Sequence, residues 1–241
     1  MSRPAVLFLR GFVASGTDRI RIGPFDRGLY YERLLPGFDD VDIFPVLGLG
    51  RGSAEIMGEN AYQSILKHPL FRCGRRFHLL GHSMGGMIAR YLAHKSDIAS
   101  RLISVTSVGC PHLGTEAAVS NSKEVTHFES VRPDLALLFN KTWKDVGGVP
   151  YFSILGSKKW SELPILFKLA DLRFNRKRLP ADGLVTVESQ RWGKELGHFD
   201  LDHLEQIGLS MHWSRKRRLT FEKEFKTYQE CLRSHWYSFK A

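Results

Sequence analysis

Cysteine is scarce in this chain, since three of its 241 residues are cysteines. They stand at Cys73, Cys110 and Cys231, an odd number without paired spacing. This pattern argues against a disulfide framework and against a cysteine-ligated zinc site. We therefore expect reduced thiols, as in a cytoplasmic protein.

Long hydrophobic runs are also absent. No stretch approaches the roughly 18 to 20 apolar residues that a membrane-spanning helix needs. The first apolar run, 5–9, is too short for the hydrophobic region of a signal peptide, and no small-residue cleavage site follows it. We expect a cytoplasmic location, with export by a leaderless route as the alternative.

Acidic residues are outnumbered, because 25 aspartates and glutamates face 35 lysines and arginines and leave a net charge of +10. Part of the basic charge is clustered in segments 72–76, 158–178 and 215–218. Such clusters are usually solvated surface, but they also favour peripheral contact with an anionic membrane surface. No nucleic-acid-binding motif accompanies them, so we expect no nucleic acid partner.

Internal repeats and low-complexity linkers are missing too, which predicts one domain over residues 1–241. Apolar runs alternate with helix-like segments, and we expect strands at 5–9, 41–46, 77–80, 102–108 and 151–155. Continuous apolar runs are typical of a parallel sheet covered on both faces, which carries its site at the carboxyl ends of the strands. The sequence therefore predicts an α/β protein.

Two segments depart from this alternation, 115–148 and 157–180, and we expect them to be cap or lid insertions. The second combines apolar residues with lysines and arginines, as an interfacial lid would. A helix packed on the core with a solvated basic face would give the same pattern. The tail 213–240 predicts a last amphipathic helix with Phe221, Phe225, Tyr228 and Leu232 on one face.

One motif carries the chemistry. Residues 81–86 read GHSMGG, so that Ser83 stands in GxSxG between the apolar run 77–80 and the helix-like segment 87–92. A strand, a sharp turn with the serine and a helix form a nucleophile elbow. Gly81 and Gly85 allow the strand and the helix to approach closely around a strained serine.

A serine nucleophile needs a base within hydrogen-bond reach, and the base needs an acid that holds its tautomer. The chain order for this kind of site is serine, acid, histidine. Asp182, in a loop after the last expected strand, is the candidate acid. His198, His203 and His212 are the candidates for the base, and sequence order alone leaves the choice open.

Five segments in order resemble the bacterial true lipases of the Pseudomonas and Burkholderia type: VLFLRGF (6–12), GHSMGG (81–86), GCPHLGT (109–115), DGLV (182–185) and HLEQ (203–206). Tyr151-Phe152-Ser153 is similar to that family's strand before the acid loop. The resemblance implies an α/β-hydrolase fold with a mostly parallel central sheet, helices on both faces and a small cap.

The resemblance also implies a function and a set of site residues. It implies a serine carboxylic ester hydrolase acting on an acyl ester or lipid, with Ser83 as nucleophile, Asp182 as acid and His203 as base. The oxyanion hole would be formed by the backbone amides of Phe12 and Met84. This chemistry requires no cofactor and no metal.

The chain departs from the family pattern at several positions. Arg10 stands where the family has a histidine that helps to order the oxyanion loop. The family's structural calcium is held partly by an aspartate two residues after the catalytic histidine, and Glu205 stands there, so a structural calcium remains open. We expect His112 to be structural and Cys110 to be no second nucleophile. The segment 115–149 is shorter than the family's lid, which favours shorter esters.

Two other functions use the same residues. An acyltransferase or thioesterase would form the same acyl-enzyme and pass it to another acceptor or take it from a thioester. A non-catalytic lipid-binding homologue would keep the fold and the basic surface. Pocket walls choose the acceptor and leaving group, and the sequence does not locate these walls.

Overall fold

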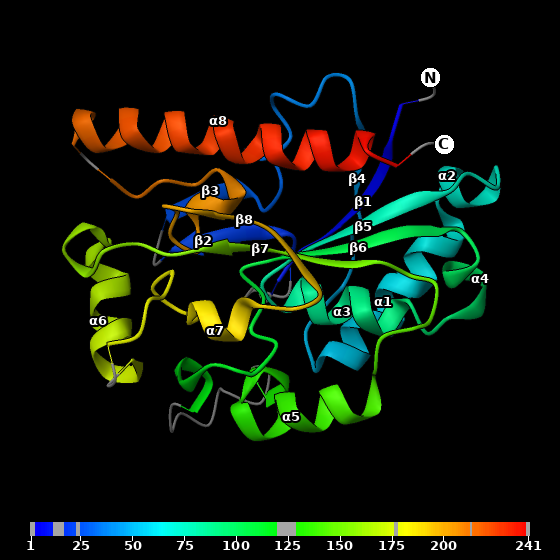
Figure 1. Cartoon of the computed structure of the whole chain (residues 1–241), viewed down its shortest axis with the longest axis horizontal. Helices are drawn as coiled ribbons and strands as arrows, with labels where there is room; N and C mark the ends of the chain where they lie inside the picture. The colour runs from blue at the N-terminus through cyan, green and yellow to red at the C-terminus, as the bar shows by residue number, and fades with distance from the viewer. Residues whose placement is uncertain are drawn as a thin grey trace.

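A six-stranded sheet lies at the centre of the computed structural model, which describes residues 3–11, 17–22, 25–119, 129–175, 178–212 and 214–239 (Figure 1). Its order is β4-β1-β5-β6-β7-β8, and each neighbouring pair is parallel. The strands are β1 (Ala5–Leu9), β4 (Asp42–Pro45), β5 (Phe77–His82), β6 (Leu102–Val108), β7 (Tyr151–Gly156) and β8 (Lys194–Phe199).

The sheet confirms the predicted α/β class and all five expected strands, and β1 and β6 have the expected bounds. The sequence did not predict β8 (KELGHF), in which Lys194, Glu195 and His198 are exposed and Phe199 is buried. An edge strand needs no continuous apolar run, because one side of it meets solvent. The antiparallel hairpin of β2 (Arg19–Ile22) and β3 (Phe25–Leu29) was also missed, since both strands contain charged residues.

Helices cover both faces of the sheet. The long helix α8 (Arg215–Tyr237) lies across one face, and α1 (Ala54–Lys67) and α3 (Met84–Leu92) lie on the other (Figure 1). Alternate residues of β1 supply the two cores: Val6 and Phe8 pack in the cluster with α8, and Leu7 and Leu9 in the cluster with α1 and α3. The four apolar residues expected on one face of the last helix are all buried.

The candidate insertions contain short helices. Segment 115–148 holds η1 (Glu116–Val119), η3 (Glu129–Val131) and α5 (Pro133–Thr142), with 120–128 outside the described residues. Segment 157–180 holds η4 (Trp160–Glu162) and α6 (Ile165–Phe174). The remaining short helices are α2 (Pro69–Arg72), α4 (Ser96–Ala99), α7 (Val187–Gln190) and η5 (Glu205–Ile207). Within the described parts of the chain, no helix has both the length and the apolar character to cross a membrane.

Candidate active site

Ser83 occupies the turn between β5 and α3, where its backbone has a φ of 55°. A non-glycine residue in this left-handed region is strained and marks a functional turn in many proteins. The two flanking glycines are required by space: a Cβ at Gly81 would lie 2.3 Å from the carbonyl carbon of Gly85, and one at Gly85 would lie 2.2 Å from the oxygen of Leu9. The predicted elbow geometry is therefore present around Ser83.

Asp182 is fully buried in the loop between β7 and β8 and accepts four hydrogen bonds. Its Oδ1 accepts from the backbone amides of Leu184 (3.0 Å) and Val185 (2.8 Å). Its Oδ2 lies 2.8 Å from Nδ1 of His203 and accepts from Nε2 of Gln206 at 3.1 Å. Four such bonds fix the orientation of the carboxylate and satisfy its buried charge.

His203 is the candidate base that contacts Asp182. Its ring also packs against His82, the residue before Ser83, with 4.7 Å between the ring centroids. His198 instead lies exposed on β8, with Nε2 2.8 Å from Oγ of Ser157. His212 lies 3.5 Å from the Glu205 carboxylate. The fold thus brings one of the three candidates to the acid and against His82, the residue before the serine.

The candidate oxyanion hole is described in part. Met84 begins α3, so that its amide belongs to the helix N-terminus, where backbone N–H groups have no helical partner. Phe12 lies outside the described residues. Its neighbour Gly11 passes directly over the nucleophile, because a Cβ at Gly11 would lie 2.6 Å from Cβ of Ser83.

Arg10 orders the segment that leads to this position. Its buried guanidinium pairs with Oδ1 of Asp18 at 2.7 Å and donates to the carbonyl oxygens of Gly11 (2.9 Å) and Gly50 (3.1 Å). From the sequence, the change from the family's histidine to Arg10 predicts the loss of a side chain that helps to order this loop. The contacts of Arg10 instead tie the end of β1 to two other loops.

Tyr30 is a site residue that the sequence analysis missed. Its hydroxyl lies 2.7 Å from Nδ1 of His82. Burial raises the pKa of Tyr30 and lowers the pKa of His82 well below its usual value, so both groups are neutral at pH 7. Tyr30 follows the unpredicted hairpin and stands in no motif, which left no signal to find it. Gln206 was inside a recognised motif, but its bond to Asp182 was not foreseen.

His112 and Cys110, the two potentially reactive side chains of the segment 109–115, are both buried. His112 stacks on Trp192, with its Nε2 2.9 Å from Oγ of Ser107, and burial lowers its pKa well below the usual value. Burial raises the pKa of the Cys110 thiol to about 12, so it is no thiolate at neutral pH. Neither group reaches the serine as a base or a second nucleophile.

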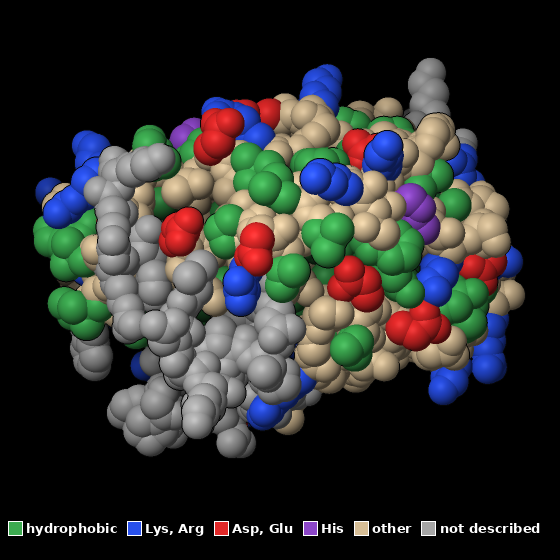
Figure 2. Space-filling view, turned by 90° about the horizontal axis from the view of Figure 1, so that it is seen from below, with side chains coloured by type: hydrophobic (Ala, Val, Ile, Leu, Met, Phe, Trp, Pro, Cys, Tyr) green, Lys and Arg blue, Asp and Glu red, His purple; other side chains and the backbone are tan. Residues whose placement is uncertain are grey.

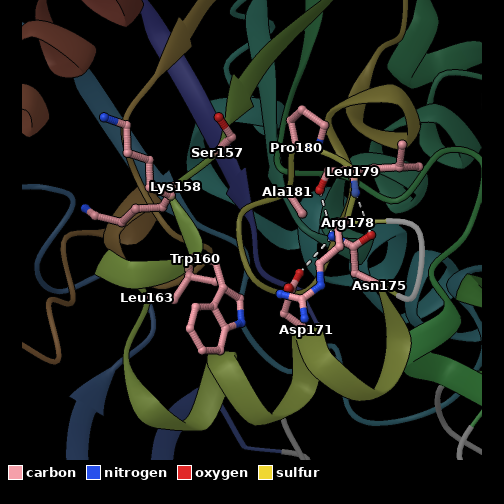
Figure 3. Close-up of a pocket in the computed structure, with 11 residues that line it drawn as sticks. Ser157, Lys158, Trp160, Leu163, Asp171, Asn175, Arg178, Leu179, Pro180 and Ala181 are labelled. Carbon is pink, nitrogen blue, oxygen red and sulfur yellow. Dashed lines mark hydrogen bonds between the residues drawn. The ribbon is translucent and has the colours of Figure 1, made fainter.

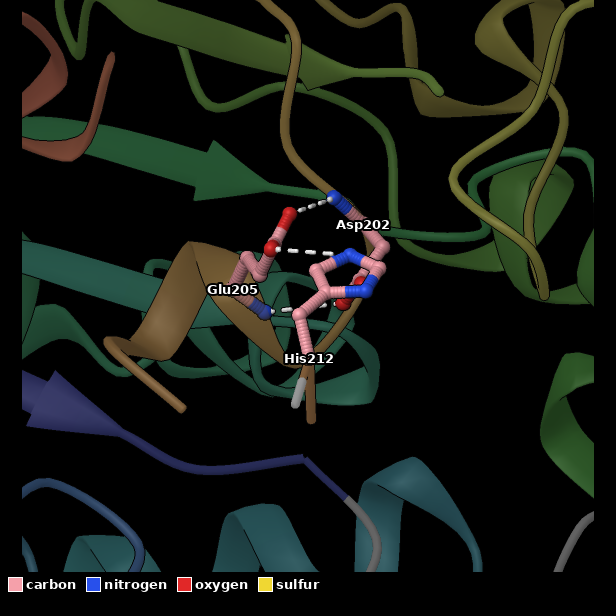
Figure 4. A group of neighbouring side chains, drawn as sticks. All are labelled: Asp202, Glu205 and His212. Atoms are coloured by element: carbon pink, nitrogen blue, oxygen red, sulfur yellow. Dashed lines mark hydrogen bonds and ion pairs between the residues drawn. The ribbon is translucent and has the colours of Figure 1, made fainter. Parts of the chain in front are cut away.

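Glu205, the position of interest for calcium, is fully buried and belongs to a cluster with Asp202 and His212 (Figure 4). Nζ of Lys158 lies 2.5 Å from its Oε2. Calcium needs several oxygen ligands at 2.3–2.6 Å, and it would compete with this ammonium for the same carboxylate oxygen. As arranged, these residues fit an internal lysine ammonium and do not fit a calcium ion.

A cavity of about 300 Å³ lies between α6 and the acid loop (Figure 3). Its lining includes Lys158, Trp160, Arg178 and Ala181, the residue before Asp182. The guanidinium carbon of Arg178 is 5.7 Å from the centre of the Trp160 ring. The cavity therefore has basic and aromatic walls next to the segment that carries the acid.

No family model matches the chain. Over 170 residues the chain is 31% identical to triacylglycerol lipase 2 of Saccharomyces cerevisiae. The matched region covers 62% of this chain and 50% of the yeast protein. The chain thus spans about half the length of this curated relative.

Two solved structures show the same fold over nearly the whole chain. A metagenomic carboxyl esterase has a TM-score of 0.75 at 16% identity and covers 98% of this chain and 76% of its own. The mature Bacillus licheniformis lipase BlEst2 has a TM-score of 0.69 at 16% identity, covering 95% and 92%. With its serine at the turn after a central parallel strand, the chain has the α/β-hydrolase fold of these lipases and esterases.

Proposed function

We propose that the chain is a serine carboxylic ester hydrolase in which Ser83, His203 and Asp182 form the catalytic triad. One observation carries the proposal: His203 bonds to the buried Asp182 and packs on His82, directly before the strained Ser83. The yeast relative is itself described as a triacylglycerol lipase, which supports an ester substrate. The motif order shared with the Pseudomonas and Burkholderia lipases supports the same roles and a kinship with that group.

In this mechanism Oγ of Ser83 attacks the ester carbonyl carbon while Nε2 of His203 takes the serine proton. Asp182 stays ionised and stabilises the imidazolium that forms. The amides of Met84 and Phe12 donate to the oxyanion of the tetrahedral intermediate. The intermediate collapses to an acyl-enzyme, and the alcohol leaves with the proton from His203. Water, deprotonated by His203, then attacks the acyl-enzyme, and the carboxylic acid is released as the bond to Oγ of Ser83 breaks and His203 returns the proton to Oγ.

The test is hydrolysis of para-nitrophenyl esters from acetate to palmitate by the purified protein. We expect Ser83→Ala to lower kcat by at least about 10³-fold, as removal of a triad nucleophile does elsewhere. Ser100→Ala, at an exposed serine in the turn after α4, serves as the matched control and should keep full activity. Turnover that survives Ser83→Ala would contradict the proposal.

The same assay separates the acyltransferase alternative. A folded protein that forms the acyl-enzyme but transfers the acyl group to an added alcohol or amine faster than to water would favour that alternative.

We further propose that lipid esters are taken from an anionic lipid surface through α6. This helix is anchored by the buried Phe167 but exposes four hydrophobic side chains: Ile165, Leu166, Leu169 and Leu172. Hydrophobic groups and basic groups lie side by side at the left edge of Figure 2, where α6 is located. An exposed apolar helix face flanked by basic charge is typical of peripheral lipid binding.

Sedimentation with vesicles tests this contact. We expect binding to vesicles of phosphatidylcholine and phosphatidylglycerol that weakens with salt, because screening shortens the reach of charge attraction. Leu169→Asp should reduce binding more than tenfold, since Leu169 is 60% exposed on α6. Leu219→Asp, at a residue 56% exposed on α8, is the matched control. Equal binding of both variants and of the unchanged protein would contradict this role of α6.

A further inference from the structure

Two buried carboxyl groups, those of Asp202 and Glu205, accept hydrogen bonds from backbone amides on either side of His203. Oδ1 of Asp202 accepts from the backbone amides of Leu204 and Glu205, both at 3.0 Å. In return, Oε2 of Glu205 accepts from the backbone amide of Asp202 at 3.1 Å. This reciprocal arrangement resembles a capping box and fixes the residues on either side of His203. Its cost is two adjacent carboxylates with almost no solvent contact.

Lys158 supplies the positive charge at this point. It follows β7, and its Nζ lies 2.5 Å from Oε2 of Glu205 and 3.2 Å from the carbonyl oxygen of Asp200. The lysine side chain is 7% exposed and the glutamate side chain 0% exposed. A fully buried glutamate requires such a partner, because an unpaired charge in the interior is strongly destabilising.

The same lysine is attached to the acid loop through its backbone. The Lys158 amide donates to the carbonyl oxygen of Ala181 at 3.0 Å, directly before Asp182. The amide of His203 donates in turn to the carbonyl oxygen of Asp182 at 2.9 Å. Lys158 therefore adds a second link between the two segments, beside the direct bonds of His203 and Gln206 to Asp182: its main chain contacts the acid loop and its ammonium group contacts the segment of the base.

We propose that the ammonium group of Lys158 is a built-in cation that holds the His203 segment against the acid loop in place of a bound metal ion. Lys158 is a positioning residue, because it acts through Glu205 and not on the substrate. The geometry of His203 then does not depend on calcium. The inference rests on the proposed ester hydrolysis for its kinetic readout, but its stability readout is independent of activity.

A variant without the ammonium group of Lys158 would leave the buried carboxyl groups of Asp202 and Glu205 without this cation. Asp202, Glu205 and His212 each offer a ligand atom, and these atoms lie within 4.8 Å of one another. Oδ2 of Asp202 is buried without a hydrogen-bond partner. Removal of the lysine charge leaves two carboxyl groups and one imidazole as ligands for a divalent cation. Lys158→Met should therefore turn a calcium-independent protein into one that calcium stabilises.

The experiment compares the unchanged protein with Lys158→Met, Lys158→Arg and Lys159→Met, which alters an exposed neighbour. Each protein is measured in EDTA and in 5 mM calcium chloride, a concentration of about the order that occupies weak calcium sites. Thermal unfolding gives Tm, and the labelling rate of Ser83 by a fluorophosphonate reports the active site without a known substrate. Ester hydrolysis gives kcat and KM separately.

We expect the unchanged protein and Lys159→Met to show the same Tm and labelling rate in EDTA and in calcium. In EDTA, Lys158→Met should lower Tm by about 5 °C or more, as loss of a buried ion-pair partner does. It should also slow labelling and lower kcat by about tenfold with little change in KM, because the base is displaced while the acyl pocket is kept. Calcium should recover part of each loss, and Lys158→Arg should retain most of the activity.

Three results would overturn the proposal. The first is a lower Tm or a slower labelling rate of the unchanged protein in EDTA, because it would mean that a bound metal ion holds the His203 segment. Lys158→Met with unchanged Tm and unchanged labelling means that the ion pair does not position His203. A lowered Tm with normal labelling and normal kcat makes Lys158 structural only. If the unchanged protein labels at Ser83 but hydrolyses no ester, the proposed function fails while the Tm and labelling comparisons still decide this inference.

Discussion

The hydroxyl of Tyr30 and Nδ1 of His82 lie 2.7 Å apart in the interior, and the ring of His82 packs against His203. This contact joins the segment after the β2–β3 hairpin to the end of β5, next to the nucleophile. The ring of His203 thus has two neighbours, the His82 ring and the Asp182 carboxylate. The neighbourhood of the serine is thus built from residues far apart in the chain.

Tyr30→Phe removes the hydroxyl and leaves Nδ1 of His82 buried without its partner. We expect the free energy of unfolding to fall by about 1–3 kcal/mol, the usual penalty for an unsatisfied buried polar group. Urea unfolding measures this difference. Tyr237→Phe, which removes a hydroxyl bonded to Asp40 at the surface, should change stability by less than about 0.5 kcal/mol. Equal effects of the two variants would refute the importance of the Tyr30 contact.

Substitution of the histidines separates the candidate bases. His203→Ala should lower kcat for ester hydrolysis by about 10³-fold or more, because the serine loses its base. His198→Ala should keep activity within about twofold, since His198 is exposed on β8 and bonds to Ser157. Steady-state kinetics of both folded variants provide the comparison. An active His203→Ala beside an inactive His198→Ala would reverse the assignment.

Gly183, directly after the acid, should not tolerate a side chain. Its φ is +98°, and a Cβ there would lie 2.8 Å from Cβ of Phe167 on α6. Gly183→Ala should destabilise the protein by about 1–3 kcal/mol and lower kcat, because the strain falls on the loop that orients Asp182. Gly147→Ala, which would meet no atom within 4 Å, is the control for the loss of a glycine. Unfolding curves and kcat that match the control would count against this packing.

Two buried histidines predict a loss of stability in mild acid. Burial lowers the pKa of His78 to about 3 and that of His235 to about 4. Between these values and the unfolded value near 6.5, the unfolded chain binds more protons, so stability rises with pH across this window and is complete above it. We expect each histidine to lower the free energy of unfolding by about 1–2 kcal/mol as the pH falls from 6.5 to 5. Urea unfolding of His78→Asn should show a shallower fall, and an unchanged slope would disprove the linkage.

The cysteines should differ in reactivity by their burial. Cys73 is exposed, whereas Cys110 is buried with its pKa raised to about 12. Iodoacetamide at pH 8 should label Cys73 in the native protein and reach Cys110 only after unfolding, because the thiolate is the reactive form. Peptide mass spectrometry identifies the labelled positions. Hydrolysis should survive labelling of Cys73, and rapid labelling of native Cys110 would contradict its burial.

The local pattern of apolar residues was sufficient to predict a strand where nearly all side chains of the segment are buried. The runs 5–9 and 102–108 are buried along nearly their whole length, and their apolar residues predicted β1 and β6 residue by residue. The elbow around Ser83 was equally readable, because Gly81, Ser83 and Gly85 stand within five consecutive residues, although the close contact at Gly85 is with Leu9 of β1. By contrast, β8 is an edge strand with exposed polar residues, and no local signal distinguishes it from a loop.

The sequence by itself determined the α/β class, the central strands and the position of the candidate nucleophile, because these depend on neighbours along the chain. Sequence order left three histidines as candidates for the base, the family resemblance implied His203, and the tertiary structure shows that His203 contacts Asp182. It alone joined Tyr30 to His82, gave Arg10 its three partners and brought Lys158 to Glu205, 47 residues away. Pairings between distant segments depend on how strands and loops are arranged in space, and no spacing in one sequence encodes that arrangement.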